Sequence, residues 1–460
     1  MRRTAGVALL TAALVLGGVP IGADAAPEAA DCASDWPTQR YLVVFETRPS
    51  PTAATESVNT ACGELRTYYP EIGVGVADSS DDRFTDRLAP HHAFSSERTG
   101  DDVVSNLPAP RPHTGSDGVA DLTDQQWNLR AVRAERAHAR QRGSDDVVVG
   151  VLDSGVDPDH PDLRHAVDRT LSVGCLSGSP DPAPETWRPT TSAHGTHVAG
   201  VLAAADDGHG VTGISPGVRV ASVRVIDDNG RVSPEAAVCG LLWAAKHGFT
   251  VVNGSFLVAP WPAVCARGPG HDVVREALSR ALHYAHAKGT LTVVAASNKA
   301  TELTPTRLGV NARSDPHACE ALPAGLREAV SVSASTRTGH KAGYSAYGLG
   351  VIDLTAPGGD RGDCVLSTVP GGYGTLCGTS MAAPHVAGVA ALVASEHPDA
   401  TPDQLRKTLT DTATAVPCPS DYDLTGNGLQ DAYCEGYTGY NGFYGHGRVD
   451  AVAALAGASR

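Results

Sequence analysis

From residue 145 onward, short apolar runs alternate with longer segments in which apolar residues recur at helical spacing. The short runs are VVVGVL, VRVASVRVI, FTVVNGSF, LTVVAAS and AVSVSAS, and the longer segments are HVAGVLAAA, PEAAVCGLLWAAKHG and VVREALSRALHYAHAKG. Strands this continuously apolar are buried on both faces. The pattern therefore predicts an α/β domain of three layers, with helices on either side of a mostly parallel central sheet.

A smaller unit comes before this domain. The stretch YLVVFETRPSPTAATESVNTACGELRTYYPEIGVGVADSSDDRF reads as strand, helix and strand, which predicts a small α/β domain within residues 26–98. Residues 99–124 contain NLPAPRPHTGSDGVAD, and their Pro, Gly, Ser and Asp content is typical of an exposed linker. The large domain is then expected over residues 125–460.

The first 25 residues have the pattern of a secretory signal. Two arginines precede an apolar stretch from Val7 to Val19, and Ala23-Asp24-Ala25 forms a small-residue cleavage site. A membrane anchor is the alternative, but the apolar stretch is short and no second segment of spanning length follows. We expect export to the extracellular space and no membrane association after cleavage.

Cysteine content and charge both fit a secreted protein. The ten cysteines are best read as disulfides in an oxidising compartment, whereas buried free thiols would suit a cytosolic chain. Closeness in sequence suggests that Cys364 pairs with Cys377 and Cys418 with Cys434. The net charge of −15 argues against a nucleic-acid partner. A monomer is the default for a chain of this size.

Three reactive side chains lie where parallel sheets collect their chemistry, at the ends of strands and the starts of helices. Asp153 ends a strand in VVVGVLDSG, His194 begins a helix in SAHGTHVAG, and Ser380 begins one in CGTSMAAPHVAG. Pro384 is expected in the first turn of that helix, where proline is tolerated. Alone, each motif has another interpretation: a turn, a helix start or two zinc ligands, and a helix cap. Together they supply the carboxylate, imidazole and hydroxyl of a serine hydrolase.

The blocks VGVLDSGVDPDHPDL, HGTHVAG and GTSMAAPHVAGVAAL closely resemble those of the subtilisin-like serine proteases (subtilases), in the Asp, His, Ser order of that family. The resemblance implies a subtilisin-like fold and a serine endopeptidase that acts on peptides or proteins. Ser380 would be the nucleophile, His194 the general base and acid, and Asp153 the group that orients His194. It makes His197 and His385 structural.

The same resemblance implies a second donor for the developing oxyanion, the side chain of Asn298 in VVAASN, beside the backbone N–H of Ser380. The alternative is that Asn298 only caps a turn. Substrate would add as a strand along the edge Asn253–Leu257, and the residues expected to bind it are Ser255, Phe256, Leu257, Ala296 and Ser297. Ser297 and Leu257 stand where glycine is common in the family, which favours a narrowed specificity.

Residues 26–98 resemble, in layout, the propeptide domain of these proteases, an inhibitor and folding aid that is removed by cleavage in the linker. Cys32 and Cys62 would leave as a closed pair. Two function classes stay open: an active endopeptidase, either a general degrader or a maturase of precursor peptides, and a catalytically silent binding scaffold. The complete set of Asp153, His194, Ser380 and Asn298 argues against the scaffold.

Catalysis by such a site needs no cofactor, but the resemblance suggests structural Ca²⁺. The expected ligands are Asp162 in DPDHPDL and Asp207 in AADDGHGV, with ordinary solvated acids as the alternative. A second loop, DLTGNGLQD, has the spacing of a calcium loop beginning at Asp423, but Cys434 stands where the closing carboxylate belongs.

Overall fold

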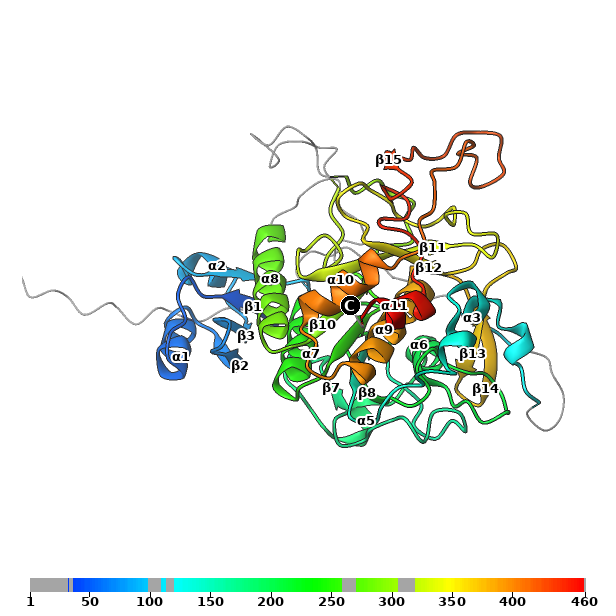
Figure 1. Ribbon diagram of the computed structural model, residues 1–460. Coiled ribbons are helices and arrows are strands. Elements are labelled where there is room, and N and C mark those ends of the chain that lie inside the picture. The colour runs from blue at the N-terminus through cyan, green and yellow to red at the C-terminus, as the bar shows by residue number, and fades with distance from the viewer. Residues whose placement is uncertain are drawn as a thin grey trace, which may run out of the picture.

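The computed structural model describes residue 32 and residues 36–97, 109–112, 120–258, 270–304 and 319–458. The predicted signal segment and most of the predicted linker lie outside the described residues. Figure 1 shows a small N-terminal unit beside a larger α/β body. The predicted α/β fold with a mostly parallel central sheet is confirmed for the described part of the chain.

The described part of the larger unit is built on one seven-stranded sheet, in the order β12-β11-β10-β9-β6-β8-β7. Neighbouring strands pair in parallel throughout this order. The strands are β6 (Val148–Asp153), β7 (Val173–Gly174), β8 (Arg219–Arg224), β9 (Val251–Gly254), β10 (Leu291–Ala295), β11 (Ala329–Ser335) and β12 (Leu354–Pro357). Five of these strands, β6 and β8 to β11, correspond to the predicted apolar runs.

Helices cover both faces of the sheet, as predicted. They are chiefly α6 (His194–Ala203), α7 (Pro234–Lys246), α8 (His271–Ala287) and α9 (Thr379–Glu396). Val149 and Val151 of β6 lie in the hydrophobic cluster that contains α6 and α9, whereas Val148 and Leu152 lie in the cluster that contains α7 and α8. This alternation is the two-residue period of a strand buried on both faces.

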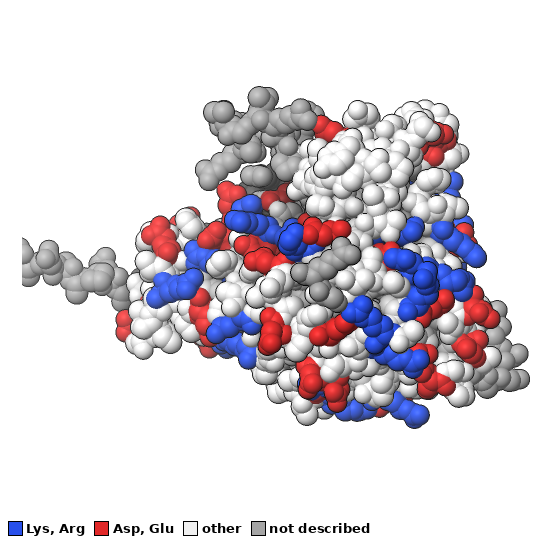
Figure 2. Space-filling model, in the orientation of Figure 1, with Lys and Arg blue, Asp and Glu red and all other residues white. Residues whose placement is uncertain are grey.

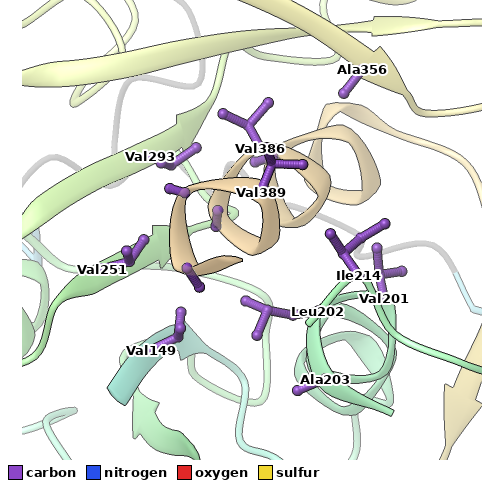
Figure 3. Packing of buried hydrophobic residues seen from close by; sticks show 14 of the residues in the cluster. Val149, Val201, Leu202, Ala203, Ile214, Val251, Val293, Ala356, Val386 and Val389 are labelled. Carbon is purple, nitrogen blue, oxygen red and sulfur yellow. The ribbon is translucent and has the colours of Figure 1, made fainter. Parts of the chain in front are cut away.

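Helix α9 runs through the centre of one of these clusters. Figure 3 shows Val386 and Val389 of α9 among Val251 and Val293 of the sheet and Leu202 of α6. Alanine is the most frequent residue of the helix, and nearly all of its length is buried. Tight packing on several sides fixes the position of its first turn, which carries Ser380.

The small unit is a four-stranded antiparallel sheet in the order β2-β3-β1-β4. Its elements are β1 (Gln39–Val44), α1 (Pro51–Thr60), β2 (Glu64–Tyr69), β3 (Val74–Ser79), α2 (Phe84–Arg87) and β4 (His92–Phe94). Tyr41, Phe45 and Phe84 belong to a hydrophobic cluster of its own. In Figure 1 the unit lies against α8, which contacts β1 and β4.

Further elements complete the described part of the chain. They are β5 (Arg111–Pro112), the 3₁₀ helix η2 (Thr123–Gln125), α3 (Trp127–Ala131), α4 (Ala134–Ala137), α5 (Pro184–Trp187), β13 (Val365–Val369), β14 (Gly372–Leu376), α10 (Pro402–Asp411), β15 (Gly436–Tyr437), β16 (Tyr440–Asn441) and α11 (Ala451–Gly457). Strand β5 pairs with β14, so part of the predicted linker is bound to the large unit. The sequence did not predict this pairing.

Disulfides fasten both units. The predicted pairs Cys32–Cys62, Cys364–Cys377 and Cys418–Cys434 are confirmed. A further pair, Cys175–Cys239, joins residues 64 positions apart, which closeness in sequence did not suggest. None of the described helices is long and apolar enough to cross a membrane.

Candidate active site

The carboxylate of Asp153 is hydrogen bonded to the ring of His194. Nδ1 of His194 lies 2.7 Å from Oδ1 of Asp153, and both side chains are buried. Oδ1 also accepts from the backbone N–H of Ser154 at 2.7 Å, whereas Oδ2 is buried without a hydrogen-bond partner among the described residues. The last residue of β6 thus meets the first residue of α6, and Nδ1 carries the proton when the carboxylate is ionised.

Ser380 is the second residue of α9, at the positive end of the helix. Its hydroxyl donates to the backbone carbonyl of Ser255 at 3.3 Å. Helices α6 and α9 pack against each other, which brings the elements carrying His194 and Ser380 together. Pro384 lies beyond the first turn of α9, so the expected first-turn position is wrong.

Asn298, in the loop after β10, contacts the first residue of α9. Its Oδ1 accepts from the backbone N–H of Thr379 at 2.9 Å and from the hydroxyl of Thr379 at 2.8 Å. The backbone N–H can only donate, so it identifies this atom as the oxygen and leaves the amide –NH₂ of an exposed side chain directed elsewhere. The amide –NH₂ of Asn298 is therefore available as a donor near the start of α9. Thr379, which the sequence did not single out, fixes the orientation of this amide.

The residues predicted to bind substrate come from two segments, one directly after β9 and one directly after β10. Ser255, Phe256 and Ala296 are buried, and Leu257 is half-buried against the α7 and α8 cluster. Ser297 is buried with φ +130°, and its hydroxyl has no hydrogen-bond partner among the described residues.

The predicted substrate edge needs a correction. Asn253 and Gly254 belong to β9, which pairs with β6 on one side and β10 on the other. A strand with two neighbours has no free edge to offer an extended peptide. Only the residues after the end of β9, Ser255 to Leu257, leave the sheet.

His197 and His385 are buried and hydrogen bonded to backbone carbonyls, which fits a structural role. Burial lowers the pKa of His197 to about 3 and that of His385 to about 4. His197 hydrogen bonds to the carbonyl of Val365 at 3.0 Å, and Nδ1 of His385 lies 2.7 Å from the carbonyl oxygen of Met381. Both rings are therefore neutral in the folded protein near pH 7.

The carboxylate of Asp162, the first predicted calcium ligand, is already bonded to protein donors. Oδ1 accepts from the hydroxyl of Tyr373 at 3.0 Å and Oδ2 from the N–H of Val211 at 3.0 Å. Burial raises the pKa of Asp162, and the nearby charge of Asp207 adds to this rise. The two predicted ligands thus lie near each other, and the oxygens of Asp162 are already hydrogen bonded without an ion.

Asp423 lies in the second predicted loop and is likewise bonded within it. Its two oxygens accept from the N–H groups of Asn427 at 2.8 Å and Gly428 at 2.9 Å. Among the residues described, no group of three or more His, Cys, Asp or Glu side chains has the arrangement of a metal site. Calcium at either loop stays a prediction.

Comparisons with known proteins agree with this arrangement. Residues 144–447 match the model of the subtilase family. A thermostable alkaline protease of Halalkalibacterium halodurans is 34% identical over 307 residues, which cover 66% of this chain and 72% of that protein. The crystal structure of a lanthipeptide protease aligns with a TM-score of 0.58 and 27% identity, over 76% of this chain and 99% of the other.

Fervidolysin from Fervidobacterium pennivorans, described as a keratinolytic enzyme related to subtilisin, aligns with a TM-score of 0.62 and 25% identity, over 92% of this chain and 61% of the other. The fold and these matches define a serine-type endopeptidase with the subtilisin fold. The chain belongs to the subtilase family. The resemblance stated from its three sequence blocks is thereby confirmed.

Proposed function

We propose that this endopeptidase uses Asp153, His194 and Ser380 as its catalytic triad and passes through an acyl-enzyme intermediate. His194 Nε2 takes the proton of Ser380 as the serine oxygen attacks the scissile carbonyl, and then gives it to the leaving amine. Water hydrolyses the resulting ester by the same route. The hydrogen bond between Asp153 and His194 is the observation that supports this proposal most strongly.

The serine hydroxyl has to turn for this reaction. It donates to Ser255 in the structure, and the proposed reaction requires it to rotate about its side-chain bond toward His194. Catalytic hydrogen bonds are commonly loose without substrate. The oxyanion would then lie between the backbone N–H of Ser380 and the amide of Asn298, whose orientation Thr379 holds.

The labelling of the mature protein by a fluorophosphonate probe tests this function. We expect wild-type protein to be labelled at one site and the Ser380→Ala variant to remain unlabelled. A folded, mature wild-type protein that stays unlabelled would favour the silent scaffold instead. Circular dichroism of both proteins establishes that they are folded.

We infer that residues 26–98 act as an inhibitory propeptide. The small unit is bonded to the large one through Arg280 of α8, whose Nη1 donates to the carbonyls of Phe45 at 2.9 Å and Ile72 at 3.2 Å. Lys246 of α7 pairs with Glu71 at 2.9 Å. These contacts attach the small unit to two helices of the catalytic unit, as binding of a propeptide requires.

Autoprocessing within residues 99–124 would release this unit. The Ser380→Ala precursor should then keep residues 26–98 covalently attached, whereas wild-type protein loses them on incubation. Mass spectrometry of the two proteins reads the result directly. Equal cleavage of both precursors, with no other protease present, would contradict autoprocessing.

Secretion is the localisation that we propose. The signal pattern of the first 25 residues supports it, as do the disulfides of the described residues, which form in oxidising compartments.

On the face shown in Figure 2, acidic and basic side chains are interspersed over the surface. Peptide or protein substrates are the expected partners, and a monomer is the expected state.

Ser297 and Leu257 favour a restricted cleavage preference, which suits the maturation of a precursor peptide better than general degradation. A side chain at each position takes up space that glycine would leave open. Profiling on a mixed peptide library separates the two roles. Cleavage after many residue types at similar rates would establish the general protease.

A further inference from the structure

Pro384 deprives the proposed nucleophile of a helical hydrogen bond. In a regular helix, the carbonyl of Ser380 would accept from the N–H of residue 384, and proline has no N–H. Ser380 is buried. A buried carbonyl without a donor is costly, so another group has to supply one.

Ser255 supplies that donor from the opposite side. Its hydroxyl donates to the carbonyl of Ser380 at 2.9 Å, while the hydroxyl of Ser380 donates to the carbonyl of Ser255 at 3.3 Å. Nδ2 of Asn253 donates to the same Ser255 oxygen at 2.9 Å. Because the oxygen accepts from Asn253, the Ser255 proton is directed at Ser380. Both supporting side chains are essentially inaccessible to solvent.

We propose that Ser255 is a positioning residue for the nucleophile: it holds the first turn of α9 through the carbonyl that Pro384 leaves free. This proposal rests on the proposed function, because it assumes that Ser380 attacks the substrate. The attacking hydroxyl and the N–H that stabilises the oxyanion both belong to Ser380. Displacement of its backbone would therefore disturb both at once.

The turnover number per titrated active site tests this role. We expect Ser255→Ala to lower kcat about tenfold, because small displacements of a reacting group are costly, and to leave KM within about twofold. Ser255→Thr keeps the hydroxyl and should recover most of the loss. Counting active sites with a fluorophosphonate removes unfolded protein from the measurement.

A matched control bond is made to another carbonyl of the same helix. The buried hydroxyl of Ser215 donates to the carbonyl of Gly388 in α9 at 2.6 Å, away from the first turn. Ser215→Ala removes the same kind of bond and should lower the melting temperature without lowering kcat per active site. An equal fall in kcat for both variants would show a general effect of loosening α9 and would overturn the proposal.

Pro384→Ala provides the decisive comparison, because it restores a backbone N–H that reaches the Ser380 carbonyl. In this background Ser255→Ala should lower kcat by less than about threefold, so the two substitutions are coupled. A tenfold loss in both backgrounds would overturn the proposal. If Ser255→Ala alone does not fold, the double variant decides: near-normal turnover supports the role and a tenfold loss contradicts it. Absence of labelling in wild-type protein would instead refute the proposed function itself.

Discussion

The hydroxyl of Tyr373 donates a hydrogen bond to Oδ1 of Asp162 at 3.0 Å, and Oδ2 of Asp162 accepts from Val211. These bonds join β14, the loop after α6 and the segment after β6. Tyr373→Phe removes one donor from a buried carboxylate. We expect the free energy of unfolding to fall by about 1–3 kcal/mol, and urea denaturation at pH 7 measures it. An unchanged midpoint would show that the bond contributes nothing.

Calcium removal tests the same carboxylate. Since both oxygens of Asp162 accept hydrogen bonds from the protein, the carboxylate is satisfied without an ion, and we expect EDTA to change the melting temperature of wild-type protein little. A fall of several degrees in EDTA, reversed by added Ca²⁺, would establish the calcium site that the family resemblance suggests. Asp162→Asn would then abolish the response, which separates this position from the loop at Asp423.

The buried histidines should make the fold acid-sensitive. Burial lowers the pKa of His385 from 6.5 to about 4, so the unfolded chain binds a proton between these pH values and the folded protein does not. The contribution of this group to the free energy of unfolding is therefore fully present above pH 6.5. It decreases as the pH is lowered, by about 3 kcal/mol at pH 4. His197, with a pKa of about 3, adds to the loss with the same sign.

Melting temperatures between pH 7 and pH 4 measure this effect. His385→Gln cannot titrate, so its loss of stability over that range should be smaller than that of the wild-type protein, although it starts from a lower value. His340→Gln, at an exposed position, is the control and should follow the wild-type curve. Parallel curves for all three proteins would contradict the assignment.

The layered fold could be predicted because its signals are local. Runs such as VVVGVL and LTVVAAS are too apolar for a half-exposed strand, and each lies within a few residues of the observed β6 and β10. The order of the strands could not be read from the same runs. The sequence alone therefore favours an edge position for Asn253, although β9 lies between β6 and β10.

The supporting contacts of the site could not be predicted from the sequence. Tyr373 meets Asp162 across 211 positions and Ser255 meets Ser380 across 125, and neither tyrosine nor serine carries a pattern that reveals such a partner. The motifs indicate which groups take part in chemistry. What holds those groups in place depends on the packing of distant segments, which the fold alone shows.

Lys341 should give the fold a second pH dependence, in the alkaline range. Its ammonium donates to the carbonyls of Ala342 at 2.9 Å and Ser345 at 2.6 Å and lies over the rings of Tyr347 and Phe443. Burial lowers its pKa from 10.5 to about 8, although the negative charges of Asp360 and Asp431 act to raise it.

Between pH 8 and 10.5 the unfolded chain keeps the proton that folded Lys341 has lost, so this group makes stability rise with pH, by about 3 kcal/mol over the window. Urea denaturation at pH 7.5 and 10 measures the change. Lys341→Met should remove this increment, and Lys407→Met, at an exposed ion pair, should keep it. If the increase in stability between pH 7.5 and 10 persists in Lys341→Met, another group is responsible for it.

Ser297 has a backbone conformation that suits glycine. With φ +130° it lies in the region that side chains disfavour, and its hydroxyl is buried without a partner. Ser297→Gly should therefore raise the free energy of unfolding by about 1 kcal/mol or more, whereas Ser297→Ala keeps the strain. If the hydroxyl also selects the residue before the scissile bond, both variants change the cleavage profile in the same way. A loss of stability in the glycine variant would show that the conformation is not strained.

Asn298 and Thr379 should act as a pair in turnover. Asn298→Ala removes a proposed oxyanion donor, and such losses lower kcat about 10²–10³-fold with little effect on KM. Thr379→Val keeps the backbone N–H to Oδ1 of Asn298 but removes the hydroxyl bond, so we expect a smaller fall. In the Asn298→Ala background, Thr379→Val should cost almost nothing more, because its bonding partner is gone. Equal losses from Thr379→Val in both backgrounds would show that the threonine acts independently of Asn298.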